Sequence, residues 1–117
     1  MLLFTLVVIL TFLVGCASNS NDICNNQQLT SVESPDKSIV AYIFTRDCGS
    51  TTKKSYQLSI LNKGEKIGNT SGNIFISYGE FAVEWIKSDE IVVKTVTNGD
   101  IFKNEQKYKG IKINYAK

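Results

Sequence analysis

The sequence predicts an all-β domain, a single small antiparallel sheet or sandwich of about six to eight strands that is held by one disulfide. Apolar side chains recur with a period of two from Ile39 onward, which is the spacing of a strand with one buried face. Turn-forming residues interrupt this pattern about every eight to twelve positions. No segment has a convincing helical period.

The first strands of this pattern follow a β-turn that has Pro35 at its second position. Residues 39–45 carry apolar side chains on both alternating sets, so we expect a central strand that is covered on both faces. Residues 56–61 alternate apolar with polar side chains and predict a second strand. A shorter strand is expected over residues 73–77.

The second half of the chain has equally clear strand signals. Trp85 lies on the apolar face of a strand that covers residues 81–85, and we expect it in the core. Residues 90–97 are rich in β-branched side chains, and Asn98-Gly99 after them predicts a hairpin with the next strand. Gly110, just before the last strand, is expected to mark a bulge.

Three segments are expected along the 117 residues: a cleaved signal peptide (1–15), a lipidated cysteine with a short polar tether (16–23) and the β domain (24–117). The first fourteen residues contain no charged side chain. A helix of that length spans about 21 Å, less than the roughly 30 Å of a bilayer core. A signal peptide therefore fits better than a permanent membrane span.

The sequence Leu13-Val14-Gly15-Cys16 resembles the lipobox of bacterial lipoproteins. The resemblance implies that a diacylglyceryl group is attached to the Cys16 sulfur and that cleavage before Cys16 leaves it as the acylated N-terminus. Two or three acyl chains give stable anchoring where one does not. We therefore expect a protein anchored by lipid to the cell membrane or the outer membrane, facing the periplasm or the cell exterior.

The other two cysteines, Cys24 and Cys48, are an even pair in a compartment that permits disulfides, so we expect them to be bonded. The bond would close a loop of about 25 residues, which the chain-entropy model values at roughly 3 to 4 kcal/mol. The alternative is a reactive thiol at Cys48. Without a histidine, only Arg46, Lys53 and Lys54 are near enough in sequence to lower its pKa.

The composition excludes several classes of function. The chain has no histidine, so the usual general base, the usual metal ligand and every Ser-His or Cys-His arrangement are missing. The net charge is only +2 and Arg46 is the only arginine, which disfavours nucleic acid as a partner. The sequence contains no phosphate-binding glycine loop and no metal-ligand cluster, and we expect neither a cofactor nor a metal.

One loop is a candidate for recognising a polar ligand. It gathers a carboxylate, hydroxyls and a glycine beside the expected disulfide: Asp47, Gly49, Ser50, Thr51 and Thr52. The alternative is a turn whose side chains bond their own backbone. Two carboxylate pairs, Glu80 with Glu84 and Asp89 with Glu90, are expected to face solvent rather than to act as acid and base.

The order of motifs from Cys24 to Tyr115 is similar to a family of small uncharacterised bacterial proteins, often lipoproteins. Its members read S-P-D-G, then R-D-C-G-A-T-T, then G-N-V-F, where this chain reads SPDK, RDCGSTT and GNIF. Lys37 in place of Gly and Ser50 in place of Ala are the departures. The resemblance implies the fold and the disulfide, and no activity.

Together these features predict a non-catalytic envelope lipoprotein that serves structure or protein interaction at the membrane surface, and not an enzyme. The alternative is an inhibitor or immunity-type lipoprotein that blocks a cell-wall-directed enzyme through an exposed loop such as residues 47–52. The expected partners are the membrane, through the lipid anchor, and an envelope protein.

Overall fold

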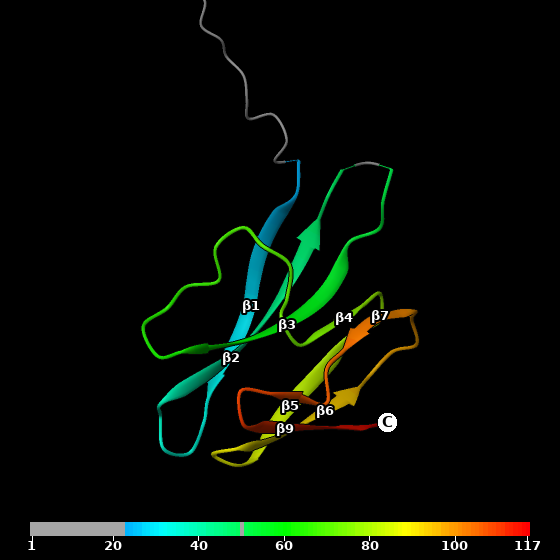
Figure 1. Cartoon of the computed structure of the whole chain (residues 1–117). Helices are drawn as coiled ribbons and strands as arrows, with labels where there is room; N and C mark the ends of the chain where they lie inside the picture. The colour runs from blue at the N-terminus through cyan, green and yellow to red at the C-terminus, as the bar shows by residue number, and fades with distance from the viewer. Residues whose placement is uncertain (1–22, 50) are drawn as a thin grey trace, which may run out of the picture.

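The computed structural model describes residues 23–49 and 51–117, which form two β-sheets (Figure 1). These residues contain no helix and nine strands. The strands are β1 (Asn25–Glu33), β2 (Ile39–Asp47), β3 (Ser55–Asn62), β4 (Phe75–Ser77), β5 (Phe81–Lys87), β6 (Glu90–Thr95), β7 (Ile101–Asn104), β8 (Lys107–Tyr108) and β9 (Ile111–Ala116). The predicted all-β, disulfide-bonded domain is confirmed. The expected signal peptide and Cys16 lie outside the described residues.

The larger sheet is antiparallel and has the strand order β1-β2-β3-β4-β7. The smaller sheet has the order β5-β6-β9-β8. Its pairing is antiparallel except between β6 and β9, which run parallel. This exception to the expected antiparallel pattern arises because the chain leaves β6 for the other sheet, forms β7 there and returns through β8.

The core lies between the two sheets and draws on both of them. Phe75 of β4 packs edge-on against Phe81 of β5, with ring centroids 4.8 Å apart, and its ring lies 5.6 Å from that of Tyr115 of β9. Removing this apolar surface from water is the main force that holds the sheets together. The buried core residues are Ala41, Ile43, Leu58, Ile60, Ile74, Phe75, Phe81, Ile91, Val93, Ile111 and Ile113.

Strand β2 is central and buried on both faces, as its sequence predicts. Ala41 belongs to the core between the sheets, whereas Phe44, on the opposite face, is fully buried outside that core. The segment between β3 and β4 crosses this outer face, where its backbone N–H groups donate to the side chains of Gln57 and Ser59. These two polar residues of β3 are therefore buried and hydrogen-bonded.

The glycines near the end of the chain do not act as the sequence predicts. Asn98-Gly99 forms no hairpin, because β6 and β7 lie in different sheets. Gly99 instead packs on Gly79, since a Cβ at Gly99 would lie 2.2 Å from the Gly79 nitrogen. The two-residue hairpin turn is Lys109-Gly110, with φ of 47° and 82°, between β8 and β9. These positive φ values are those of a type I′ turn, so Gly110 completes a turn rather than a bulge.

Three of the four edge strands contain a bulge. The register shifts by one residue at Leu29 in β1, at Ile86 in β5 and at Phe102 in β7. Each of these side chains is exposed, by 52%, 53% and 57% respectively. The fourth edge strand, β8, has only two residues.

Trp85 connects the two sheets near the C-terminal end of β1. It packs against the core from β5, and its indole N–H donates to the carbonyl of Val32 at 2.9 Å. Because Val32 belongs to the other sheet, this bond fixes how the edges of the sandwich meet. The expected core position of Trp85 is therefore correct, and the side chain also bridges the sheets.

Candidate functional site

The Cys24–Cys48 disulfide lies where the chain enters the domain. Asn25 of β1 pairs with Asp47 of β2, so the cysteines are the next opposing pair beyond the two strands. Their sulfur atoms are bonded at 2.06 Å. The predicted disulfide is thereby confirmed, and Cys48 has no free thiol to act as a nucleophile.

The candidate recognition loop begins directly after this bond, and several of its polar groups form hydrogen bonds within the loop. The Asp47 carboxylate accepts the N–H of Gly49 at 3.1 Å, and the hydroxyl of Thr52 donates to the Gly49 carbonyl at 3.3 Å. Gly49 has a φ of 121°, which favours glycine. Thr51 is exposed, and Ser50 lies outside the described residues. Asp47, Gly49 and Thr52 therefore shape the loop, and among its described residues Thr51 takes no part in these hydrogen bonds.

The structure joins this loop to a shallow hollow of about 240 Å³ on the outer face of the larger sheet. Two aromatic rings at the hollow, Tyr78 and Phe102, pack edge-on with centroids 4.8 Å apart. The ammonium group of Lys53 lies 4.9 Å from the Tyr78 ring centroid, a cation–π geometry. The lining residues are Arg46, Cys48, Thr52, Lys53, Ser55, Gln57, Ile76, Tyr78 and Phe102.

A polar network fixes the same end of the domain. The guanidinium of Arg46 donates to the side-chain oxygens of Asn26 at 2.8 Å and Asn69 at 3.3 Å. Asn69 in turn donates to the carbonyl of Cys24, and Asn26 donates to the carbonyls of Gly68 and Thr70. The network therefore binds the segment after β3 to the first residues of β1 and leaves the charge of Arg46 facing neutral oxygens.

Sequence reasoning identified the loop but missed the aromatic and asparagine parts of this site. Tyr78 lies in a turn and Phe102 in a bulge, and neither position has a local signal of function. Pairing of β4 with β7 brings them together. Asn69 lies between two strands, in a segment without strand periodicity, so no sequence pattern links it to Arg46. Only the Asp-Cys-Gly sequence of the loop itself marked this end of the domain.

Three of the four carboxylates considered as acid–base pairs, those of Glu80, Glu84 and Glu90, make contacts with other side chains. Glu84 forms an ion pair with Lys94 at 2.7 Å, and this hydrogen bond and charge lower its pKa. The Glu90 carboxylate accepts a hydrogen bond from Asn114, and that of Glu80 accepts a long one from the Tyr56 hydroxyl. These contacts support structural roles at the sheet surface.

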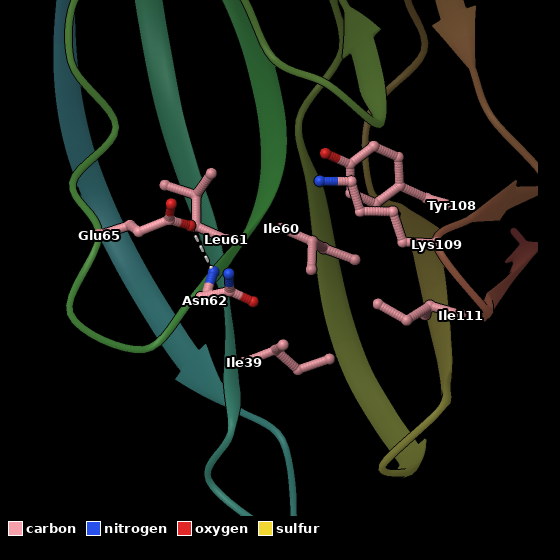
Figure 2. Close-up of a pocket in the computed structure, with 8 residues that line it drawn as sticks. All are labelled: Ile39, Ile60, Leu61, Asn62, Glu65, Tyr108, Lys109 and Ile111. Atoms are coloured by element: carbon pink, nitrogen blue, oxygen red, sulfur yellow. Dashed lines mark hydrogen bonds between the residues drawn. The ribbon is translucent and has the colours of Figure 1, made fainter.

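A second hollow, of about 270 Å³, opens at the opposite end of β2 and β3 (Figure 2). Isoleucine side chains from both sheets, including Ile60 and Ile111, form its walls. Lys109 lies at its rim beside Tyr108, and the backbone N–H of Asn62 donates to the Glu65 carboxylate. This hollow is the mouth of the sandwich, with a mixed polar rim and an apolar interior.

The two remaining pKa shifts belong to structural groups. Hydrogen bonds, first from the backbone N–H of Ser38 and then from the Ser38 and Ser34 hydroxyls, lower the pKa of Asp36 in the turn before β2. Burial, with the charge of Glu105, raises the pKa of Tyr115 to about 12. Neither group lines either hollow.

Within the described residues no three His, Cys, Asp or Glu side chains converge as metal ligands would. The same part of the chain has no helix with the length and hydropathy of a membrane span. Comparison of the chain with protein-family models, with curated proteins and with solved structures finds no match.

Proposed function

We propose that the protein is a non-catalytic lipoprotein of the bacterial envelope, tethered through lipid on Cys16, whose β domain serves structure or protein interaction at the membrane surface. The observation that carries this proposal is the Cys24–Cys48 disulfide, because such bonds persist in oxidising compartments outside the cytoplasm. Its position, eight residues after Cys16, supports a lipid tether that ends where the folded domain begins.

The experiment compares the wild type with Cys16→Ser after metabolic labelling with a radioactive or clickable fatty acid. The wild type should carry the label and float with membranes, whereas Cys16→Ser should accumulate as an unlabelled precursor that retains residues 1–15. Mass spectrometry of the mature wild type should show Cys24 and Cys48 linked. Equal labelling of the two proteins would exclude Cys16 as the anchor.

A second candidate is an inhibitor or immunity-type lipoprotein that acts on a cell-wall-directed enzyme. The observation that favours it is the loop after Cys48, which the disulfide holds at its base and in which Thr51 is exposed. Thr51→Arg should then abolish inhibition of a purified cell-wall hydrolase that the wild type binds stoichiometrically. Lys112→Arg, on the other sheet, is the matched control and should leave inhibition unchanged.

A further inference from the structure

We propose that the hollow beside the Cys24–Cys48 disulfide docks on the phosphate headgroups of anionic phospholipids in the membrane that carries the anchor. This inference rests on the proposed lipid on Cys16. It adds an orientation to the tether, with one end of the sandwich lying on the bilayer and the other directed away from it.

The point where the chain enters the domain carries the first step of the argument. Cys24 is eight positions after Cys16, and a chain of that length spans at most about 28 Å when it is fully extended. The disulfide holds Cys48 beside Cys24, and Cys48 lines the hollow. The hollow therefore lies at the tethered end, within reach of the membrane that the acyl chains enter.

The charge of this end complements an anionic surface. Neither of the two ion pairs found in residues 23–49 and 51–117 includes Arg46, Lys53 or Lys54. Arg46 is held by amide oxygens, which leave its charge uncompensated. Asp47, whose carboxylate accepts a hydrogen bond from the loop backbone, and Asp100, whose carbonyl accepts the N–H of Tyr78, offset only part of the charge of the three cations. Basic residues near an anionic leaflet are attracted to it, each by enough to raise affinity about five-fold.

The aromatic side chains supply the second component of an interfacial surface. Phe102 is 57% exposed although it is a large apolar residue, and it packs on Tyr78 at the rim of the hollow. Aromatic rings are enriched at the level of lipid headgroups, where an apolar body and a polar tip are both accommodated. Lys53 above Tyr78 places a cation beside these rings.

The opposite end of the sandwich provides the controls. Arg46 lies seven positions along β2 from Ile39, which lines the second hollow, and this distance along the strand is about 23 Å. Ile86 lies beside Trp85, which bonds Val32 near the far end of β1. Ile86 and Phe102 are thus both exposed bulge residues on edge strands, at different distances from the tether.

The test uses the full lipidated chain with its native tryptophan removed by Trp85→Phe and a single probe introduced by Phe102→Trp or, as the control, by Ile86→Trp. Vesicles are made of phosphatidylcholine alone or with phosphatidylglycerol, both with brominated acyl chains that quench tryptophan at short range. Phosphatidylglycerol should deepen quenching at position 102 by about two-fold and leave position 86 unchanged. Adding Lys53→Glu with Lys54→Glu should remove the effect, whereas Lys109→Glu with Lys112→Glu should not.

Flotation of the same samples separates the possible failures. A chain that does not float with phosphatidylcholine vesicles lacks the anchor, which overturns the proposed function. A chain that floats but is quenched equally at both positions, or equally in both lipids, overturns the orientation alone. If glycerol phosphate in solution prevents the quenching at position 102, the ligand is the free phosphate ester and not the bilayer. If position 102 is shielded only after an envelope protein is added, the ligand is that protein.

Amine labelling of the unmodified protein avoids any dependence on the tryptophan variants. Lys53 and Lys54 should lose about five-fold in labelling rate when phosphatidylglycerol is added, while Lys109 and Lys112 should keep theirs. Raising the salt concentration should restore the labelling of Lys53 and Lys54, because exposed charges are screened within about a Debye length. Equal rates at all four lysines in both lipids would overturn the proposal.

Discussion

Replacing Cys24 and Cys48 together by serine should lower the free energy of unfolding by about 3.5 kcal/mol. The bond spans a sequence separation of 24, so it closes a loop of about 25 residues. In the chain-entropy model this loop removes about 12 cal/mol/K from the unfolded chain, which is about 3.5 kcal/mol at 25 °C. The folded state should lose little, because Asn25 still pairs with Asp47 and Asn69 still donates to a backbone carbonyl at position 24.

Urea unfolding followed by Trp85 fluorescence measures this loss, since the indole contacts both sheets and reports their separation. The variant should unfold at a lower urea concentration. Its unfolding free energy should also depend more steeply on urea concentration, because an unlinked chain exposes more surface when it unfolds. Reducing the wild type with a thiol is the independent control and should reproduce the same loss. A decrease below about 1 kcal/mol by both routes would refute the entropic reasoning. A decrease in the variant alone would place the cause in the serines.

Three other substitutions test local features of the fold. Gly99→Ala should lower the free energy of unfolding in urea by at least about 2 kcal/mol, because its Cβ would lie 2.2 Å from the Gly79 nitrogen. Gly64→Ala, where the site is open and only the backbone is strained, should cost less. Equal costs for the two variants would exclude the close approach as the cause. Lys37→Gly should raise the thermal midpoint, with a gain of about 0.5 kcal/mol, because Lys37 has a φ of 63°; no gain would show that the turn tolerates lysine without strain. The Tyr115 pKa of about 12 in the folded state lies above the unfolded value, so its stabilising contribution is complete below about pH 10 and is lost as the pH rises towards 12. The difference in unfolding free energy between the wild type and Tyr115→Phe should therefore shrink over that range, and a constant difference would contradict the assignment.

The strands from β2 to β4 could be predicted from sequence because they are set by local alternation, whereas β1 (Asn25–Glu33), most of whose residues are exposed, was not predicted. Apolar side chains on both sets of residues 39–45 gave β2 its central position, and the buried faces of the structure agree. The buried state of Gln57 and Ser59 could not be predicted, because it depends on the segment that returns across the outer face. Alternation separates the faces of a strand and does not tell what covers them.

The connection after β6 could not be predicted from the local sequence either, but for a different reason. Asn98-Gly99 has the composition of a type I′ hairpin turn, yet Gly99 has no positive φ and serves a close backbone approach to Gly79. The real turn, Lys109-Gly110, places a lysine in a conformation that glycine or asparagine usually adopts. Both glycines are therefore needed, but tertiary packing decides which of them turns the chain.

The candidate site likewise has a part that the sequence predicts and a part that it does not. The disulfide and the loop after it follow from cysteine count and turn composition, and the structure confirms the bond. The rings of Tyr78 and Phe102 meet there through strand pairing, and Arg46 meets Asn69 through the returning segment. Such contacts join residues that are distant in sequence, and a single sequence carries no record of them.

The bulges at Leu29, Ile86 and Phe102 have a consequence if the protein is confined to a surface by the proposed lipid on Cys16. Lipid-anchored molecules diffuse in two dimensions and meet side by side, in the geometry that would let one sheet continue into its neighbour. A continuous ladder between molecules needs uninterrupted edges, and each bulge breaks the spacing of the free N–H and C=O groups on its strand. Under the proposed lipid anchor, the domain could therefore be densely packed on a membrane while each copy remains a separate folding unit.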